Sequence, residues 1–385
     1  MKTAFRGQSA PATALVREYL PALTGLRFLL AVWVILHHIA GKGMMLDGWT
    51  QGLPEAGKRL VLGGYLAVDT FFVLSGFVLA RSYSATSWDR RSLAQYFAAR
   101  FARIYPVYAL SLAVVAPFIF DSMTLPTRSL AVKSGLLLKY ALVLQGWYGN
   151  LGVGWNTPAW TLSCEFFFYL LFPALFIGLR RMNRGALGLV LAIAVVTPVA
   201  LAHAHVPWTW KPLYHTSDFV AGIAAARIFE GTDWRPLRRH GAWLYLPALA
   251  TGAWLIVHPT FLNHVLIFGW GWDVNTGLRP LNVLALLGLG LGSGYGARLL
   301  SSAAIEYLGK ASYSMYILHV PVLWWYSKWA IHQPYMPATV AALVYLGIVI
   351  GFSALAFEVV EKPANRWIRA RVAARRADVP KRLAA

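Results

Sequence analysis

The chain has 385 residues, of which 58% are hydrophobic and 13% are charged, and its formal net charge is +20. A soluble domain of this length must cover itself with polar surface, so the composition excludes that class and indicates a polytopic membrane protein. The single cysteine excludes an intramolecular disulfide framework, and no metal-ligand cluster is visible in the sequence, so we expect no metal.

Ten apolar runs have about the length that a helix needs to cross a bilayer. They predict an all-α polytopic bundle of about ten transmembrane helices. An eleventh run, 136–148, is too short to cross and is predicted to be interfacial or re-entrant. The predicted spans are 22–41, 61–80, 104–120, 158–179, 185–203, 213–229, 241–257, 281–297, 311–330 and 338–358.

We divide the chain into an N-terminal segment 1–21, a transmembrane domain 22–358 and a basic tail 359–385. The side of the membrane that holds the N-terminus carries 24 Lys and Arg residues, and the opposite side carries 8. By the positive-inside rule both termini are cytoplasmic, which agrees with an even number of crossings. The basic charge therefore favours orientation and lipid contact over nucleic-acid binding.

The first span carries three ionisable side chains, Arg27, His37 and His38. Such groups are costly inside a membrane helix unless they face a polar interior, so they are candidate functional residues. From helix geometry, Arg27 and His38 lie about 20° apart around the axis and about 16 Å apart along it, whereas His37 is rotated by about 80°. We expect Arg27 and His38 to share a face without His37. Alternatively, Arg27 and His38 snorkel to the headgroups.

Asp69 lies in the second span among aromatic and branched neighbours, where a carboxylate needs a partner. We expect it to accept a hydrogen bond from a histidine ring, which fixes the tautomer of that ring and raises its basicity. Ser75 and Gly76 form a small-residue patch farther along the same span, and close helix packing is their expected role.

Arg100 and Arg103 stand three residues apart at the entrance to the third span, on the side predicted to be cytoplasmic. Their spacing allows both guanidinium groups to grip one anion. Ordinary positive-inside charge explains the pair almost as well. The first interpretation makes them binding residues, and the second makes them topology signals.

Thr161, Glu165 and Tyr169 follow one another at i, i+4 and i+8 in the fourth span and form a polar stripe directed inward. Glu165 lies about 10 Å below the outer end of its helix and Asp69 about 12 Å below its own. The two acids are therefore expected at similar depth, with His38 nearer the outside. A purely structural hydrogen-bond network between helices is the alternative.

A second stripe, Ser312, Tyr316 and His319, occurs at i, i+4 and i+7 in the ninth span. His319 fits a hydrogen-bonded core histidine better than a catalyst. We therefore place all three residues in a supporting network.

Taken together and in order, these elements resemble acyltransferase family 3, the integral-membrane acyltransferases that modify bacterial surface polysaccharides, related glycans or secondary metabolites. The resemblance covers nearly the whole chain. It rests on Arg27 followed after ten residues by His38, on Val68–Phe77, on Arg100-Phe-Ala-Arg103, on Trp160–Glu165 with Tyr169 and Pro173, on Ser312–His319 and on Glu361-Lys362-Pro363.

Two features depart from the family pattern. Thr161 replaces the usual serine and keeps the hydroxyl group. The sequence also ends about 27 residues after the last predicted span, without the extracytoplasmic hydrolase-like domain that some relatives carry. We therefore expect the membrane domain or a separate protein to complete transfer to the acceptor.

The resemblance implies a multi-pass O-acyltransferase of the bacterial inner membrane. It would move a short acyl group, acetyl in particular, from acyl-coenzyme A as co-substrate to a hydroxyl of a glycan or secondary metabolite, with no bound cofactor. Arg27, Arg100 and Arg103 would hold the phosphates of the donor, and His38 would be the general base, oriented by Asp69 or Glu165. The supporting network would consist of Thr161, Tyr169, Ser312, Tyr316, His319 and Glu361.

Two alternatives stay open. Within the same class, His38 could form an acyl-enzyme intermediate. From another class, a proton-coupled transporter or glycan flippase could use His38, Asp69 and Glu165 as a proton relay. The transporter would need no thioester, and the absence of visible inverted repeats in the sequence weighs modestly against it.

Overall fold

The computed structural model describes residues 19–121, 129–148, 155–207, 210–261, 274–330 and 336–377. Every regular element within those ranges is helical, which confirms the predicted all-α fold class. Of the predicted terminal segments, residues 1–18 and 378–385 lie outside the described residues.

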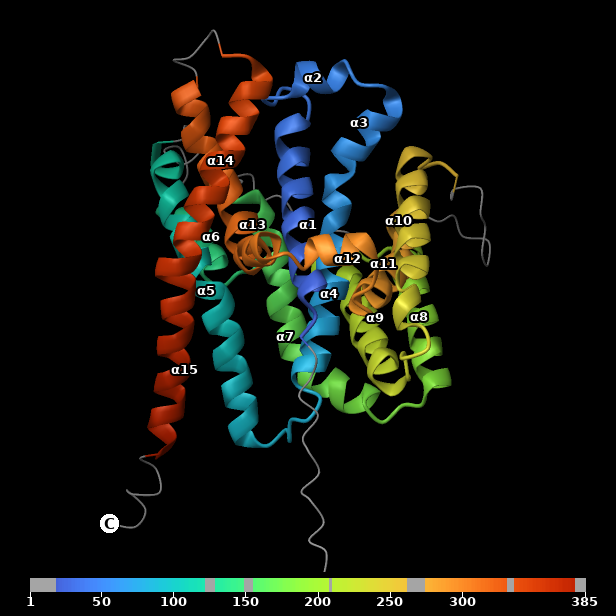
Figure 1. Ribbon diagram of the computed structural model, residues 1–385. Helices are drawn as coiled ribbons and strands as arrows, with labels where there is room; N and C mark the ends of the chain where they lie inside the picture. The colour runs from blue at the N-terminus through green and yellow to red at the C-terminus, as the bar shows by residue number, and fades with distance from the viewer. Residues whose placement is uncertain are drawn as a thin grey trace, which may run out of the picture.

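The helices form one bundle in which most axes run roughly in the same direction (Figure 1). In the first part of the chain they are α1 (Pro21–Ala40), α2 (Asp47–Gln51), α3 (Glu55–Leu62), α4 (Ala67–Ser82), α5 (Arg90–Asp121) and α6 (Leu130–Ala141). The middle part contributes α7 (Trp160–Leu179), α8 (Arg184–His203), α9 (Lys211–Gly231) and α10 (Ala242–Val257). The last part contributes α11 (Val274–Gly290), α12 (Gly294–Leu300), α13 (Ala303–Ala330), α14 (Ala338–Ala356) and α15 (Lys362–Ala377).

The protein is a multi-pass membrane protein. Seven helical stretches of the described chain are long and apolar enough to cross a bilayer, and the pair α11 and α12 passes the same test together. α9 and α13 coincide with the two remaining predicted spans but are not among the seven. Both helices carry several charged residues, which lower their hydropathy.

One predicted span is broken. The run 281–297 was expected to be a single helix, but α11 ends at Gly290 and α12 continues at an angle of 80°. Gly292 and Gly294, at the corner, have φ values of 70° and 85°, which residues without a Cβ adopt readily. α6 has 12 residues, so it is shorter than a spanning helix, and it includes only the first part of the short run 136–148 that was predicted to be interfacial or re-entrant.

The helices α4 and α9 approach each other very closely at a pair of glycines. A Cβ atom on Gly76 would lie 2.1 Å from the Phe219 carbonyl oxygen, and one on Gly222 would lie 2.0 Å from the Val73 carbonyl oxygen. Only residues without a side chain fit at these positions. The predicted packing role of Gly76 is therefore confirmed.

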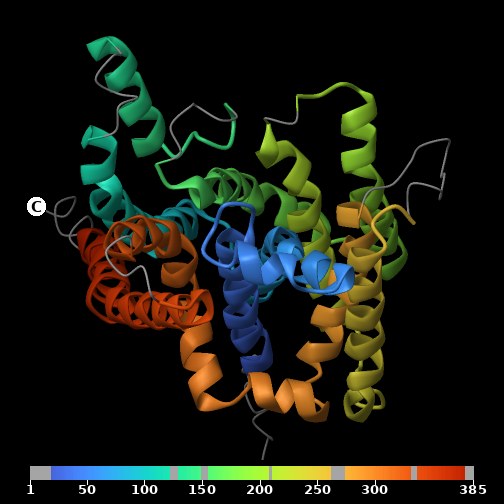
Figure 2. The ribbon, with the colours of Figure 1, turned by 90° about the horizontal axis from the view of Figure 1, so that it is seen from above.

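The first helix occupies the middle of the bundle. Seen from above, α1 has the dark orange and red helices α13, α14 and α15 on one side and the green to yellow helices α8, α9 and α10 on the other, where α11 also lies (Figure 2). It packs against α4 and α13. The start of α1 and the end of α15 face the same end of the molecule (Figure 1). Arg27 lies near the start of α1 and His38 near its end.

Candidate active site

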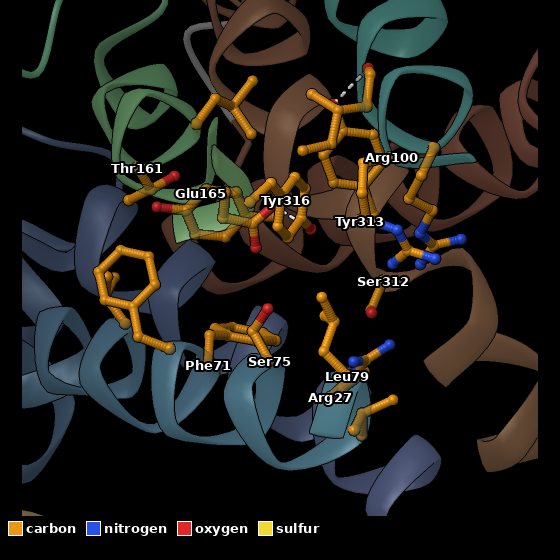
Figure 3. Close-up of a pocket in the computed structure, with 17 residues that line it drawn as sticks. Arg27, Phe71, Ser75, Leu79, Arg100, Thr161, Glu165, Ser312, Tyr313 and Tyr316 are labelled. Atoms are coloured by element: carbon orange, nitrogen blue, oxygen red, sulfur yellow. Dashed lines mark hydrogen bonds between the residues drawn. The ribbon is translucent and has the colours of Figure 1, made fainter. Parts of the chain in front are cut away.

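A cavity of about 850 Å³ lies among α1, α4, α5, α7 and α13. We call it the arginine pocket because three guanidinium groups line it. Figure 3 shows Arg100 on one side of the cavity and Thr161 with Glu165 on the opposite side. Eight of the predicted site residues line it: Arg27, Arg100, Arg103, Thr161, Glu165, Tyr169, Ser312 and Tyr316.

The three arginines differ in their partners. Arg103 forms an ion pair with Glu361, whose other carboxylate oxygen accepts a hydrogen bond of 2.8 Å from Ser314. Arg100 lies over the ring of Tyr83, at 5.6 Å from the ring centre to the guanidinium carbon, and donates a long hydrogen bond of 3.4 Å to its hydroxyl group. Within the part of the chain that the structure describes, neither Arg100 nor Arg27 forms an ion pair with a carboxylate.

Glu361 reaches this region through an irregularity of the backbone. It is the last residue of a π-helical turn, Phe357–Glu361, between α14 and α15, and its side chain is almost completely buried. Turns of this kind are rare and widen the helix by one residue. From this turn the carboxylate of Glu361 contacts Arg103 on α5 and Ser314 on α13. The C-terminal part of the chain therefore holds one of the arginines that line the arginine pocket.

The polar stripe of α7 lies along the wall of the arginine pocket. Tyr169 donates a hydrogen bond of 3.2 Å to Glu165, and Thr161 donates one of 2.9 Å to the Pro158 carbonyl oxygen. The structure thus places Glu165 among the arginines, with Tyr169 as its hydrogen-bond partner. Of the two acids expected to orient His38, Glu165 therefore does not do so.

A second cavity of about 940 Å³ contains the histidines of α1, and we call it the histidine pocket. Val68 and Tyr316 line both cavities, so the two are neighbours. The polar and aromatic residues that line the histidine pocket are His37, His38, Tyr65, Asp69, Trp160, Lys211, His215, Asn275 and Tyr316.

The tautomer of His38 is fixed by its own helix. Its Nδ1 atom lies 2.9 Å from the Val34 carbonyl oxygen. A carbonyl oxygen can only accept, so Nδ1 donates its proton and Nε2 keeps a lone pair. Beside it lies the ring of His319, with ring centres 4.9 Å apart. No carboxylate is needed to orient the His38 ring, because the backbone already does so.

His37 was expected on another face of α1 than Arg27 and His38, yet both histidines open onto one pocket. His37 lines the same pocket, and its Nδ1 donates to the Leu62 carbonyl oxygen at 2.5 Å. A rotation of about 80° is smaller than the sector that this wide cavity covers on α1. The two rings still have different neighbours, because His37 contacts Tyr65, in the short 3-10 turn Gly63–Leu66 between α3 and α4, and His38 contacts His319 in the core.

Asp69 does pair with a histidine, but with one that the sequence did not single out. Its Oδ1 atom lies 3.1 Å from Nδ1 of His215, a residue of α9. The same nitrogen lies 3.3 Å from Asp218, which forms a buried ion pair with Arg279 of α11. The expected contact between Asp69 and His38 is therefore wrong, because α4 packs against α9 closely enough for His215 to occupy that carboxylate.

This four-residue network could have been noticed in the sequence. His215 and Asp218 stand three apart in an apolar run, the spacing that brings two side chains to one helix face. The ligand atoms of Asp69, His215 and Asp218 lie within 4.8 Å of one another, which would suit a metal ion. However, the guanidinium group of Arg279 already pairs with Asp218 and repels a cation. We therefore interpret the cluster as an ion-pair network.

The stripe on α13 divides between the two sides of this region. Ser312 and Tyr316 line the arginine pocket, whereas His319 is fully buried beside His38. His319 Nδ1 donates to the Tyr316 carbonyl oxygen at 2.7 Å, which leaves Nε2 as an acceptor without a partner among the described residues.

Comparison with known proteins gives a consistent answer. A family described as an acyltransferase domain matches residues 20–358. Acyltransferase MdmB of Streptomyces mycarofaciens is 32% identical over 378 residues, which cover 91% of this chain and 92% of that protein. Peptidoglycan O-acetyltransferase OatA of Listeria monocytogenes is 24% identical over 331 residues, which cover 80% of this chain and 50% of that protein. No solved structure matches the chain.

Proposed function

The chain belongs to acyltransferase family 3, and on that premise we propose that it transfers a short acyl group, acetyl in particular, from acyl-coenzyme A to a hydroxyl group of a glycan or secondary metabolite. The acyltransferase class follows from the family. The donor, the acceptor and the roles of individual residues are our proposal, and the two neighbouring cavities support it.

The observation that carries the proposal is the charge of the arginine pocket. Three guanidinium groups line it, and only one of them pairs with a carboxylate in the described chain. Unpaired guanidinium groups in a cavity are suited to phosphate, which they bind through two parallel hydrogen bonds. Coenzyme A carries its phosphates at one end and its thioester at the end of a long flexible arm. We place the phosphates at Arg27 and Arg100, with Arg103 beside them.

The second cavity supplies the base. His38 Nε2 has a lone pair, and the pocket that it lines meets the arginine pocket at Val68 and Tyr316. The roughly 16 Å between Arg27 and His38 along α1 suits an acyl arm that extends from phosphates to thioester. We propose that the acceptor occupies the histidine pocket and that its hydroxyl group meets the thioester near this junction.

The proposed reaction is direct transfer with general-base catalysis. His38 Nε2 takes the proton of the acceptor hydroxyl group as its oxygen bonds to the acyl carbon. The carbon–sulfur bond then breaks, and the proton passes from His38 to the thiolate of coenzyme A. The products are an ester and free coenzyme A.

We further propose that the protein lies in the bacterial inner membrane with both termini in the cytoplasm. The distribution of basic residues supports this orientation. Arg27 then lies toward the cytoplasm, where acyl-coenzyme A is made, and His38 lies toward the outside. The donor would enter from one side and the acceptor from the other.

Mass spectrometry of surface glycans and small metabolites, from cells with and without the protein, tests this function. We expect one class of molecule to gain the mass of one acyl group only when the protein is present. Purified protein supplied with isotope-labelled acetyl-coenzyme A should pass the label to that molecule. A protein that moves the molecule across the membrane without acylating it would contradict the proposal and favour a transporter.

A further inference from the structure

We infer that the acceptor is an anionic molecule whose carboxylate or phosphate group binds Lys211 in the histidine pocket. This inference deepens the proposed function and rests on it, because it names the chemical class of molecule that occupies the pocket of His38. Three features of that pocket carry the argument: the surroundings of Lys211, the balance of the acidic groups, and an unpartnered oxygen on Asn275.

Lys211 is the first residue of α9, and its half-buried side chain lines the histidine pocket. The ammonium nitrogen lies over Trp160, 4.1 Å from the ring centre. In the described chain it forms no ion pair with a carboxylate. A contact with an aromatic ring holds a cation in place but leaves its charge uncompensated. A partly buried charge gains from an anionic partner, which the protein itself does not supply here.

The acidic groups near the pocket are already matched. Asp69 is the carboxylate residue that lines the pocket, and it contacts His215. Asp218, behind it, contacts His215 and pairs with Arg279. The two carboxylates of Asp69 and Asp218 therefore face the guanidinium group of Arg279 and the imidazole ring of His215. With that ring protonated, the two positive charges balance the two negative charges. Lys211 is left as the cation of the pocket whose counterion must come with the ligand.

Asn275 provides a second polar contact. It lines the same pocket from α11, and its Oδ1 atom is buried without a hydrogen-bond partner in the described residues. Buried polar atoms are normally satisfied, and an amide oxygen accepts hydrogen bonds. A hydroxyl group of the ligand supplies the missing donor. The pocket therefore fits a hydroxylated molecule with an acidic group, such as a uronic acid or a phosphorylated sugar.

The experiment uses the full chain and the acylated molecule isolated from cells. Wild-type protein is compared with Lys211→Gln, Lys211→Arg and, as a matched control, Lys42→Gln, which removes a lysine from an exposed position that lines neither pocket. Each purified variant is supplied with labelled acetyl-coenzyme A and with the isolated molecule after its ester has been removed. The KM of each substrate is then measured separately.

We expect the isolated molecule to carry a carboxylate or a phosphate. Loss of one charge-assisted contact should raise its KM by about tenfold or more in Lys211→Gln, with the donor KM unchanged. Lys211→Arg should keep most of the affinity, and Lys42→Gln should match the wild type. Sensitivity of the molecule to phosphatase identifies a phosphate, and mass loss of carbon dioxide on fragmentation identifies a carboxylate.

The possible failures are distinguishable. A neutral acylated molecule would overturn this inference and leave the proposed function intact. So would an anionic molecule whose KM is the same for Lys211→Gln and the wild type. If no molecule is acylated in cells, the proposed function itself is wrong, and the inference falls with it.

Discussion

Replacement of His38 by alanine should reduce acyl transfer by two to four orders of magnitude. The Val34 carbonyl oxygen holds the proton on Nδ1, so Nε2 is the atom that we propose as the base, and alanine removes it. General-base catalysis contributes about 10²- to 10⁴-fold, which corresponds to about 3 to 5 kcal/mol of activation free energy. Donor binding should be unchanged, because His38 does not line the arginine pocket.

The assay measures transfer of labelled acetyl groups by purified protein, together with the Kd of a non-reactive coenzyme A thioester analogue. His37→Ala is the matched control, since both rings line one pocket and each donates to a backbone carbonyl. His37 lies toward Tyr65, away from the core, so its loss should leave most of the activity. An inactive His37→Ala combined with an active His38→Ala would refute the assignment of the base.

Three further predictions concern the donor, the packing and the topology. Arg100→Gln should weaken acyl-coenzyme A binding by about 10- to 100-fold in a binding titration. Arg103→Gln should weaken it less, because the guanidinium group of Arg103 already pairs with Glu361. Equal losses of affinity in the two variants would contradict this order. Gly76→Ala should lower the stability by about 1–3 kcal/mol, measured as a lower melting temperature. Gly188 has open space around it, so Gly188→Ala should leave the melting temperature unchanged. Equal melting temperatures for the two variants would contradict the close contact at Gly76. A reporter fused after Arg184 should report the cytoplasm, and an external signal would mean that the number of crossings before it is odd.

The local patterns of the sequence predicted the helices well. Apolar runs of spanning length correspond to α1, α7, α8 and α14, because burial in lipid leaves a strong and continuous signal. The corner at Gly292 and Gly294 was missed, since glycine is common inside membrane helices and does not by itself mark a break. α5 begins at Arg90, well before its predicted span, because the residues from Arg90 to Arg103 include four arginines and no long apolar run.

Pairing between helices could not be predicted in the same way. Spacing along one helix correctly grouped Thr161, Glu165 and Tyr169 on one wall, because these positions are linked by the geometry of a single element. Whether a given carboxylate meets His38 or His215 depends on how closely two helices approach. For Asp69 that distance is set by the glycine contact between α4 and α9, which no pattern within either helix reveals.

The position of Asp69 also changes what the acids of this site can do. A carboxylate beside His38 would stabilise the protonated ring and could keep the proton there after the acceptor has reacted. Among the described residues, the partner of His38 Nδ1 is the Val34 carbonyl oxygen, and the nearest ring neighbour of His38 in the core is another histidine, His319. A base held in this way gives up its proton more readily to the departing thiolate. The negative charge of Asp69 is instead paired with His215, and in our inference Lys211 is the residue that binds the acceptor.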